Sequence, residues 1–232
     1  MKVIVSDFDG TLYCNQKISY VDKINKFVND GNIFIIATGR NINYLKSDLD
    51  KVNLKCNYYI CNDGALIYDQ FFNIVYRMDI DNSMVRPIYN FLKDDDNLVE
   101  VLIDTGNGYV NDTSRSANKI IARYFNKNRA QDTVNRLNNQ FNSVYAYLGN
   151  TSVNVTKKTE TKGSAIKFLG EYYNLFKHDI YIIGNAINDL SMIQDGIISY
   201  GVKCEDNVDI EKFDKTVHSF EEAFDDIVKS SK

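Results

Sequence analysis

The sequence contains a single proline, Pro87, in 232 residues. It also has no Gly/Ser-rich stretch, no low-complexity segment and no repeat of solenoid period. We therefore expect no proline-rich or flexible linker between parts of the chain. Apolar residues make up 44% of the chain and charged residues 25%, which is enough apolar material for a core. The length allows one large domain, or a core with a modest second domain.

An excess of basic charge is missing too. Lys and Arg number 27 against 31 Asp and Glu, which gives a net charge of −4. Because nucleic-acid binders need a basic face, we expect no nucleic-acid partner. No apolar run approaches the ~20 residues that a membrane span requires, and the first such run stops at Ser6 and Asp7, too early for a signal peptide. The expectation is a cytoplasmic protein without a membrane partner, and nothing indicates its oligomeric state.

Cysteine and histidine are scarce. The four cysteines show no C-x-x-C spacing, and two histidines, His178 and His218, are the only ones available to join them. These numbers argue against a zinc site. We expect reduced, mostly structural thiols at all four positions, Cys14, Cys56, Cys61 and Cys204.

Short apolar, β-branched runs alternate with segments of helical spacing at both ends of the chain. Strands are expected over 2–6, 33–37, 58–61, 180–183 and 197–202. Helices are expected over 19–30, where Gly31 ends the helix, and over 41–52, 162–173, 187–194 and 219–228. Continuous apolar strands that alternate with helices predict an α/β fold, a Rossmann-like parallel sheet covered on both faces.

The middle of the chain has a different rhythm. Runs at 65–68 and 74–76 predict a hairpin. A helix, strands at 98–103 and 109–111, a helical region over 114–141, and strands at 144–148 and 153–156 are expected to follow. That order is typical of an α+β unit with an antiparallel sheet. We therefore predict a core formed by residues 1–80 and 156–232, with an α+β domain inserted at 81–155.

Polar residues follow the expected core strands. In parallel sheets, ligands bind beyond the carboxyl ends of the strands, so these residues are expected to meet at one edge. They are Asp7-Phe8-Asp9-Gly10-Thr11, then Thr38-Gly39-Arg40, then Asn62-Asp63-Gly64, and then Gly184-Asn185-Ala186-Ile187-Asn188-Asp189.

Asp7 and Asp9 stand two residues apart on an extended segment, so both carboxylates can face one pocket. Two such carboxylates repel each other unless a cation lies between them or one holds a proton. Mg²⁺ suits an oxygen-rich site with few protein ligands. One carboxylate can attack phosphorus and the other can act as acid and base. The alternative is a capped turn after a strand, where Asp and Gly are common.

Three further residues admit two interpretations each. The Thr38 hydroxyl, with the amides of Thr38 and Gly39, can bind a phosphate oxygen or only cap a helix. Lys162 opens a helix, where its ammonium opposes the dipole, which indicates a role beyond an ordinary surface lysine. Asp189 lies in a first helical turn, where an acid is favoured without any catalytic function.

The order of these motifs resembles the haloacid dehalogenase-like phosphatase superfamily. The four matching motifs are Asp7-x-Asp9-Gly10-Thr11, Thr38-Gly39-Arg40, Lys162-Gly163 and Gly184-x-x-x-Asn188-Asp189. The long insertion is similar to the large α/β cap of the Cof-type branch, as is the segment at 61–68. The resemblance covers nearly the whole chain and is weakest in the cap.

This resemblance implies a role for each matching residue. Asp7 is expected to be the nucleophile and a metal ligand, and Asp9 the acid and base with its carbonyl on Mg²⁺. Lys162 is expected to be catalytic and to bind the phosphoryl group. The other phosphate- or substrate-binding residues would be Gly10, Thr38, Gly39, Arg40 and Asn188, and the metal site would comprise Asp7, Asp9, Asn185 and Asp189. The implied function is Mg²⁺-dependent hydrolysis of a small phosphorylated metabolite, such as a sugar phosphate, through an aspartyl-phosphate.

Two residues depart from the family pattern. Asn185 stands where the family usually has an aspartate, which removes one negative charge from the metal site. Asp63 stands where the family usually has asparagine, and its charge is one candidate to offset that loss. Asn185 keeps open a catalytically weakened phosphate-binding or regulatory protein, and a phosphomutase with the same intermediate is a further alternative. A dinucleotide-binding dehydrogenase is set aside, because the first loop is acidic and lacks G-x-G-x-x-G.

Overall fold

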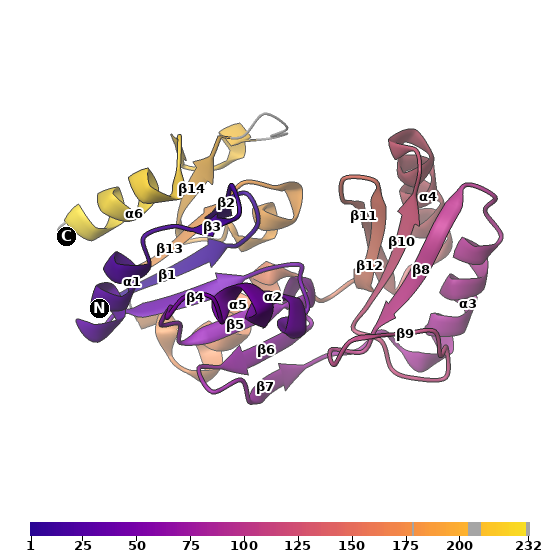
Figure 1. Ribbon diagram of the computed structural model, residues 1–232, viewed down its shortest axis with the longest axis horizontal. Coiled ribbons are helices and arrows are strands. Elements are labelled where there is room, and N and C mark those ends of the chain that lie inside the picture. The colour runs from indigo at the N-terminus through magenta and orange to yellow at the C-terminus, as the bar shows by residue number, and fades with distance from the viewer. Residues whose placement is uncertain (178, 204–209, 231–232) are drawn as a thin grey trace.

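The computed structural model describes residues 1–177, 179–203 and 210–230, which form a larger core and a smaller cap (Figure 1). Both ends of the colour scale meet in the core, whereas the cap carries the middle colours alone, so the cap is an insertion. Cys204 and His178, considered above as possible ligands, lie outside the described residues.

The core contains an eight-stranded sheet in the order β15-β14-β13-β1-β4-β5-β6-β7. Its parallel strands are β1 (Lys2–Asp7), β4 (Ile33–Ala37), β5 (Tyr58–Cys61), β13 (Asp179–Gly184), β14 (Ile198–Val202) and β15 (Lys215–Val217). An antiparallel hairpin, β6 (Leu66–Asp69) and β7 (Ile74–Arg77), extends it at one edge. The predicted parallel sheet and hairpin are confirmed. The apolar, β-branched runs favour strands that are buried on both faces.

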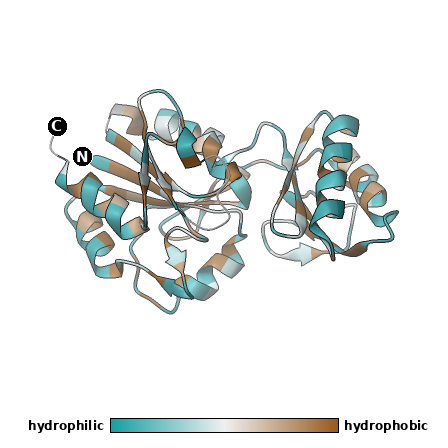
Figure 2. Ribbon diagram, turned by 90° about the horizontal axis from the view of Figure 1, so that it is seen from above, coloured by the Kyte–Doolittle hydropathy of each residue, from teal (hydrophilic) through white to brown (hydrophobic). Residues whose placement is uncertain are grey.

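Helices cover both faces of this sheet. Ile4 of β1 packs with α1 (Val21–Asn29), α2 (Ile42–Leu49) and α6 (Phe220–Lys229) in one apolar cluster. Val3 and Val5 point the other way and pack with α5 (Lys162–Tyr172). This alternation is the period of a β-strand, and each fully buried aliphatic side chain contributes roughly 1.5–3 kcal/mol. In Figure 2 the core strands are largely brown, in accord with burial on both faces.

The cap is a five-stranded antiparallel sheet in the order β11-β12-β10-β8-β9. The strands are β8 (Leu98–Asp104), β9 (Tyr109–Val110), β10 (Lys119–Tyr124), β11 (Val144–Leu148) and β12 (Ser152–Lys157). Two helices, α3 (Asn82–Lys93) and α4 (Lys127–Gln140), bury one sheet face in a separate apolar cluster. The opposite face carries Lys119, Tyr145, Tyr147 and Thr156 by strand alternation, and we call it the polar face of the cap.

The helical region predicted over 114–141 is partly wrong, because residues 119–124 form β10 and the helix begins at Lys127. Ile120, Ala122 and Tyr124 are buried while Arg123 is exposed, a period of two that the helical interpretation overlooked. The helix predicted over 187–194 is a 3₁₀ helix, η3 (Ile187–Met192).

Several short elements were not predicted. Strands of two or three residues carry too few side chains for a periodic pattern to emerge. They are a hairpin of β2 (Tyr13–Cys14) and β3 (Lys17–Ile18), strand β15, and the 3₁₀ turns η1 (Asn62–Gly64), η2 (Leu175–Lys177) and η4 (Ile210–Lys212). Over the described ranges, none of the helices combines the length and apolar character needed to span a bilayer.

Gly64 lies in η1, between β5 and β6, and packs against the residue that precedes α5; its backbone has φ +109°. A Cβ there would collide with the carbonyl of Thr161, the residue that caps α5. Gly31 has φ +86° but open space around it.

We expect Gly64→Ala to lower the free energy of unfolding by more than Gly31→Ala, in urea denaturation. Both alanines carry the strain of a positive φ, about 1–3 kcal/mol, but the one at position 64 adds overpacking of about 1–3 kcal/mol. Equal losses in the two variants would contradict a steric role for Gly64.

Candidate active site

The carboxyl ends of the core strands gather the polar residues at the edge nearest the cap. In Figure 1 the arrowhead of β1 points toward the cap, and Asp7 is the last residue of that strand. Thr38 follows β4, Asp63 follows β5, and Asn185 follows β13. Lys162 is the first residue of α5, after a capping box in which Thr161 and Ser164 bond each other's backbone amides.

Asp7, Lys162 and Asp189 form a buried cluster. The Lys162 Nζ donates to Asp7 Oδ1 at 2.5 Å and to Asp189 Oδ1 at 2.6 Å. Lys162 is 1% exposed, Asp7 5% and Asp189 0%. Burial and the charge of Asp189 raise the pKa of Asp7 to about 7, although the Lys162 ammonium opposes the shift. Burial alone would lower the pKa of Lys162, but the carboxylates of Asp189 and Asp7 raise it, so Lys162 stays charged.

The second oxygen of Asp7 is the feature that fits a cation. Asp7 Oδ2 is buried and has no hydrogen-bond partner among residues 1–177, 179–203 and 210–230. The side-chain amide of Asn185 lies against Gly10, in the loop that follows Asp7, because a Cβ on Gly10 would collide with that amide. Two carboxylates against one ammonium leave the cluster with excess negative charge. Hard oxygen donors of this kind suit Mg²⁺.

Within the residues that the structure describes, no group of three or more His, Cys, Asp or Glu is arranged to hold a metal. Mg²⁺ does not require such a group, because one or two carboxylates commonly hold it while it keeps several waters. Structural zinc sites, in contrast, are closed by four protein ligands. The residues present fit Mg²⁺ on these terms.

Asp189 holds the loop after β13. Its Oδ2 accepts hydrogen bonds from the amides of Asn185, at 2.8 Å, and Ala186, at 2.9 Å. Its Oδ1 accepts from Lys162, so both oxygens are engaged. Gly184 leaves the room for this, since a Cβ there would lie 2.7 Å from the Asp189 Cβ. Asp189 thus combines the predicted helix-terminus position with a direct bond to the predicted catalytic lysine.

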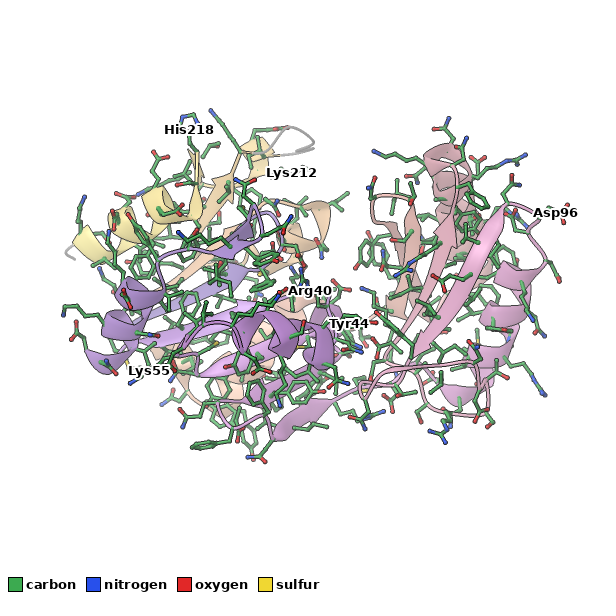
Figure 3. All side chains as sticks on the ribbon, in the orientation of Figure 1. Arg40, Tyr44, Lys55, Asp96, Lys212 and His218 are labelled. Carbon is green, nitrogen blue, oxygen red and sulfur yellow. The ribbon has the colours of Figure 1, made fainter. Side chains whose placement is uncertain are left out.

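Asp9 and Arg40 form a pair of their own. Arg40 donates to Asp9 through two nitrogens, at 2.5 and 2.8 Å, and to Asp48 at 2.7 Å. The Asp9 side chain is 52% exposed, in contrast to Asp7. The guanidinium also lies over the Phe8 ring, 4.9 Å from its centroid. Figure 3 shows Arg40 and Tyr44 at the end of the core nearest the cap. There the guanidinium contacts two carboxylates and two aromatic rings.

Thr38 is 1% exposed. Of its amide and its hydroxyl, only the hydroxyl can donate to a phosphate oxygen. Its amide donates to the Ile60 carbonyl at 2.8 Å, so this predicted phosphate donor is taken by the sheet. The hydroxyl oxygen accepts from the Arg40 amide at 3.1 Å, which leaves the hydroxyl proton to donate. Gly39 is close-packed, because a Cβ there would lie 3.0 Å from Asp63 Oδ1 and 3.3 Å from Lys119 Nζ.

Asp63 lies at the centre of a second buried cluster that joins the core to the cap. Its Oδ1 accepts from Asn188 Nδ2 at 2.9 Å. Its Oδ2 accepts from Lys119 Nζ and from the Tyr147 hydroxyl, each at 2.5 Å. Burial would raise the pKa of Asp63, but the charges of Lys119 and Lys162 and these hydrogen bonds lower it to about 2. Its negative charge is therefore balanced largely by Lys119.

Lys119 and Tyr147 were not among the residues predicted from the sequence. Neither belongs to a motif; the nearest motif begins at Lys162, 43 residues after Lys119 and 15 residues after Tyr147. The period-two burial of β10 and β11 was the one available signal, because it separates both residues from the apolar face of the cap.

A cavity of about 350 Å³ lies between the core and the polar face of the cap. The core lines it with Asp63, Thr161, Lys162, Ile187, Asn188 and Ser191, and the other lining residues are Tyr145, Tyr147, Thr156, Lys158 and Glu160. We call it the cap–core cavity. Its volume is in the range of small-molecule sites, and Lys162 connects its wall to Asp7.

A model of the haloacid dehalogenase-like hydrolase family matches residues 4–119 and 109–207, well over half of the chain. Two proteins of known sequence are similar over most of their length. An uncharacterized protein of Mycoplasma capricolum is 28% identical, with 83% of this chain and 87% of that protein covered. A protein of Bacillus subtilis, named 5-amino-6-(5-phospho-D-ribitylamino)uracil phosphatase, is 21% identical, with 90% and 89% covered.

Solved structures share the fold. A protein of Thermotoga maritima has a TM-score of 0.79 at 17% identity, with 99% of this chain and 98% of that one covered. A protein described as a subclass IIB sugar phosphatase has a TM-score of 0.78 at 18% identity, with 96% and 95% covered. These likenesses extend over both the core and the cap.

Proposed function

This chain belongs to the haloacid dehalogenase-like hydrolase family and is a phosphatase of that family, and we propose that it hydrolyses a small phosphorylated metabolite through an aspartyl-phosphate on Asp7. The observation that carries the proposal is the state of the Asp7 carboxylate. It is buried, paired through Oδ1 with the Lys162 ammonium, and unpartnered at Oδ2 within the described part of the chain. A carboxylate so held is oriented for attack and has an oxygen left to bond with phosphorus.

In the first step an Asp7 oxygen bonds to phosphorus and the bond to the leaving oxygen breaks, with a proton supplied by Asp9. In the second step Asp9 takes a proton from water, whose oxygen attacks phosphorus and releases Asp7 and inorganic phosphate. Arg40 fixes the orientation of the Asp9 carboxylate through two hydrogen bonds. Lys162 offsets negative charge beside the phosphoryl group.

The phosphoryl group in this proposal is bound by Lys162, the Thr38 hydroxyl, Asn188 and the loops at Gly10, Gly39 and Arg40. Mg²⁺, when bound, supplies positive charge to the phosphoryl oxygens during transfer. It would be held by Asp7, Asp9 through its carbonyl, and Asn185. Asp189 would contribute through water, since its oxygens already bond Lys162 and two amides.

The cap–core cavity is our candidate for the rest of the substrate. In this proposal residues 81–155 form the cap over a core of 1–80 and 156–232. A volume of about 350 Å³ suits a small metabolite, and a sugar phosphate is one compound of that size. The phosphatase names of the Bacillus subtilis relative and the subclass IIB neighbour support this class of substrate.

The function is tested by phosphate release from a generic aryl phosphate, with and without Mg²⁺. We expect release that depends on Mg²⁺. Replacing Asn185 with aspartate restores a negative charge, so we expect half-saturation at roughly tenfold lower Mg²⁺, equivalent to about 1.4 kcal/mol. Asn139→Asp, which adds an equal charge at an exposed position on α4, is the matched control. An unchanged Mg²⁺ requirement in Asn185→Asp would contradict a metal-ligand role for this residue.

Asn185 also favours a second candidate, a phosphate-binding or regulatory protein with little turnover. It predicts that the native chain binds phosphate without releasing it from esters, and that Asn185→Asp gains activity. Full Mg²⁺-dependent activity of the native chain would exclude it.

A further inference from the structure

The Asp63 carboxylate bonds both parts of the molecule at once. On one oxygen it holds Asn188, which follows β13 in the core, and on the other it holds Lys119 and Tyr147 from the cap. Asp63 and Lys119 are each 4% exposed, so this ion pair is shielded from water. A buried pair of this kind is rigidly specified, because neither charge has an alternative partner in solvent.

The Lys119 ammonium has no donor left for a substrate. An ammonium carries three N–H donors, and Lys119 Nζ has three acceptors: Asp63 Oδ2 at 2.5 Å, the Gly39 carbonyl at 3.1 Å and the Tyr147 hydroxyl at 3.2 Å. Two of these acceptors belong to core loops in the candidate site. Lys119 therefore acts on that site through Asp63 and Gly39, not by touching a ligand itself.

The cap sheet dictates which side chains reach Asp63. Ile120 and Ala122 of β10, and Val144 and Ala146 of β11, point into the apolar cluster under α3 and α4. Strand alternation turns Lys119 and Tyr147 to the opposite face, which lines the cap–core cavity. The alternation of residues along β10 and β11 therefore determines that Lys119 and Tyr147 face Asp63.

We propose that Asp63 is a positioning residue that couples the seating of the cap, through Lys119 and Tyr147, to the placement of Asn188 and the Gly39 loop around the phosphoryl group. The inference rests on the proposed phosphatase function, since it assigns the coupled loops to phosphoryl binding. It also accounts for the acid at position 63. An asparagine amide in its place would leave the Lys119 ammonium buried without a counter-ion.

The test is calorimetric titration of the full chain with inorganic phosphate in the presence of Mg²⁺, which needs no turnover. We expect Lys119→Met to weaken phosphate binding by about 10-fold to 100-fold, because small displacements of binding loops have effects of that size. In an Asp63→Asn background the same change should have less than about threefold effect, since the link is already broken. Tyr147→Phe removes one hydroxyl alone and serves where Lys119→Met folds poorly. Its smaller effect should vanish in the same background.

Lys127→Met and Asp132→Asn are matched controls, because both side chains are exposed on α4. They should leave phosphate binding unchanged. A Lys119→Met effect of equal size in both backgrounds, or none in either, would overturn the coupling.

The radius of gyration from small-angle X-ray scattering tests the role of Asp63 in seating the cap separately from the proposed phosphatase function. We expect it to rise in Asp63→Asn and in Lys119→Met, because the cap loses its buried ion pair with the core. If the native chain binds no phosphate, the proposed function fails while the scattering comparison still decides whether Asp63 seats the cap. Unchanged scattering and unchanged phosphate affinity in both single variants would refute the inference alone.

Discussion

Replacing Asp7 with asparagine is expected to reduce the rate of phosphate release by about 10⁴-fold or more, the scale of losing a covalent nucleophile. The amide keeps the shape of the side chain but cannot form a stable acyl-phosphate. The fold should persist, because burial and the nearby Asp189 carboxylate both disfavour a negative charge at position 7, and the amide removes that charge. After a rapid acid quench, radiolabelled phosphoryl should remain on the native chain and be absent from the variant.

The matched control for Asp7→Asn is Asp132→Asn, which removes an equal charge from an exposed position inside α4. It should leave both activity and thermal midpoint unchanged. If Asp7→Asn retained more than about 1% of the native rate, a loss far smaller than nucleophile removal produces, Asp7 would not be the nucleophile. A phosphoryl label that persisted in the variant would lead to the same conclusion.

Replacing Lys162 with methionine is expected to abolish most activity and to destabilise the metal-free fold by about 3–5 kcal/mol. The methionine fills the space but leaves Asp7 and Asp189 buried together without a countercharge. An ammonium in the first turn of α5 opposes the helix dipole by only ~0.3–1 kcal/mol, so relief of that term is too small to compensate. The loss of the two ion pairs is therefore the larger effect, and Lys162→Met is expected to be less stable than the native chain.

Urea denaturation in EDTA and in Mg²⁺ measures this effect. Mg²⁺ should restore part of the lost stability, because a cation can replace the missing positive charge. Adding Asp7→Asn to Lys162→Met should restore part of it as well, because one of the two carboxylates is then gone. Lys167→Met, an exposed residue of the same helix, is the control and should lie within about 0.5 kcal/mol of the native chain. A similarly small loss in Lys162→Met would mean that its ammonium does not hold this cluster together.

The edge of the core sheet was predictable because its signals are local. The run that ends at Asp7 and the run before Thr38 are continuous and apolar, and such runs are buried strands. Parallel strands present their carboxyl ends together, so the order of motifs along the chain was enough to bring Asp7, Lys162 and Asp189 to one place. Contacts at 2.5 and 2.6 Å confirm that Lys162 meets both acids.

The strand at 119–124 escaped prediction for the opposite reason. Its six residues alternate between the apolar cluster and the polar face of the cap, but the surrounding polar residues at helical spacing mask a period of two. Ile120, Ile121 and Tyr124 favour a strand by propensity, and pairing with β8 and β12 establishes it.

Composition and periodicity by themselves predicted the α/β core and the inserted cap, because each depends on burial patterns within single segments. The order of the motifs predicted that Asp7, Lys162 and Asp189 meet at one edge, because parallel strands present their carboxyl ends together. Only the tertiary structure decided that Arg40 holds Asp9 and Asp48, that Asp189 braces its own loop, and that Lys119 and Tyr147 close on Asp63. Hydrogen bonds between distant segments depend on the register of paired strands and the packing of loops. The sequence alone does not indicate which opposite charge a given charged side chain will pair with.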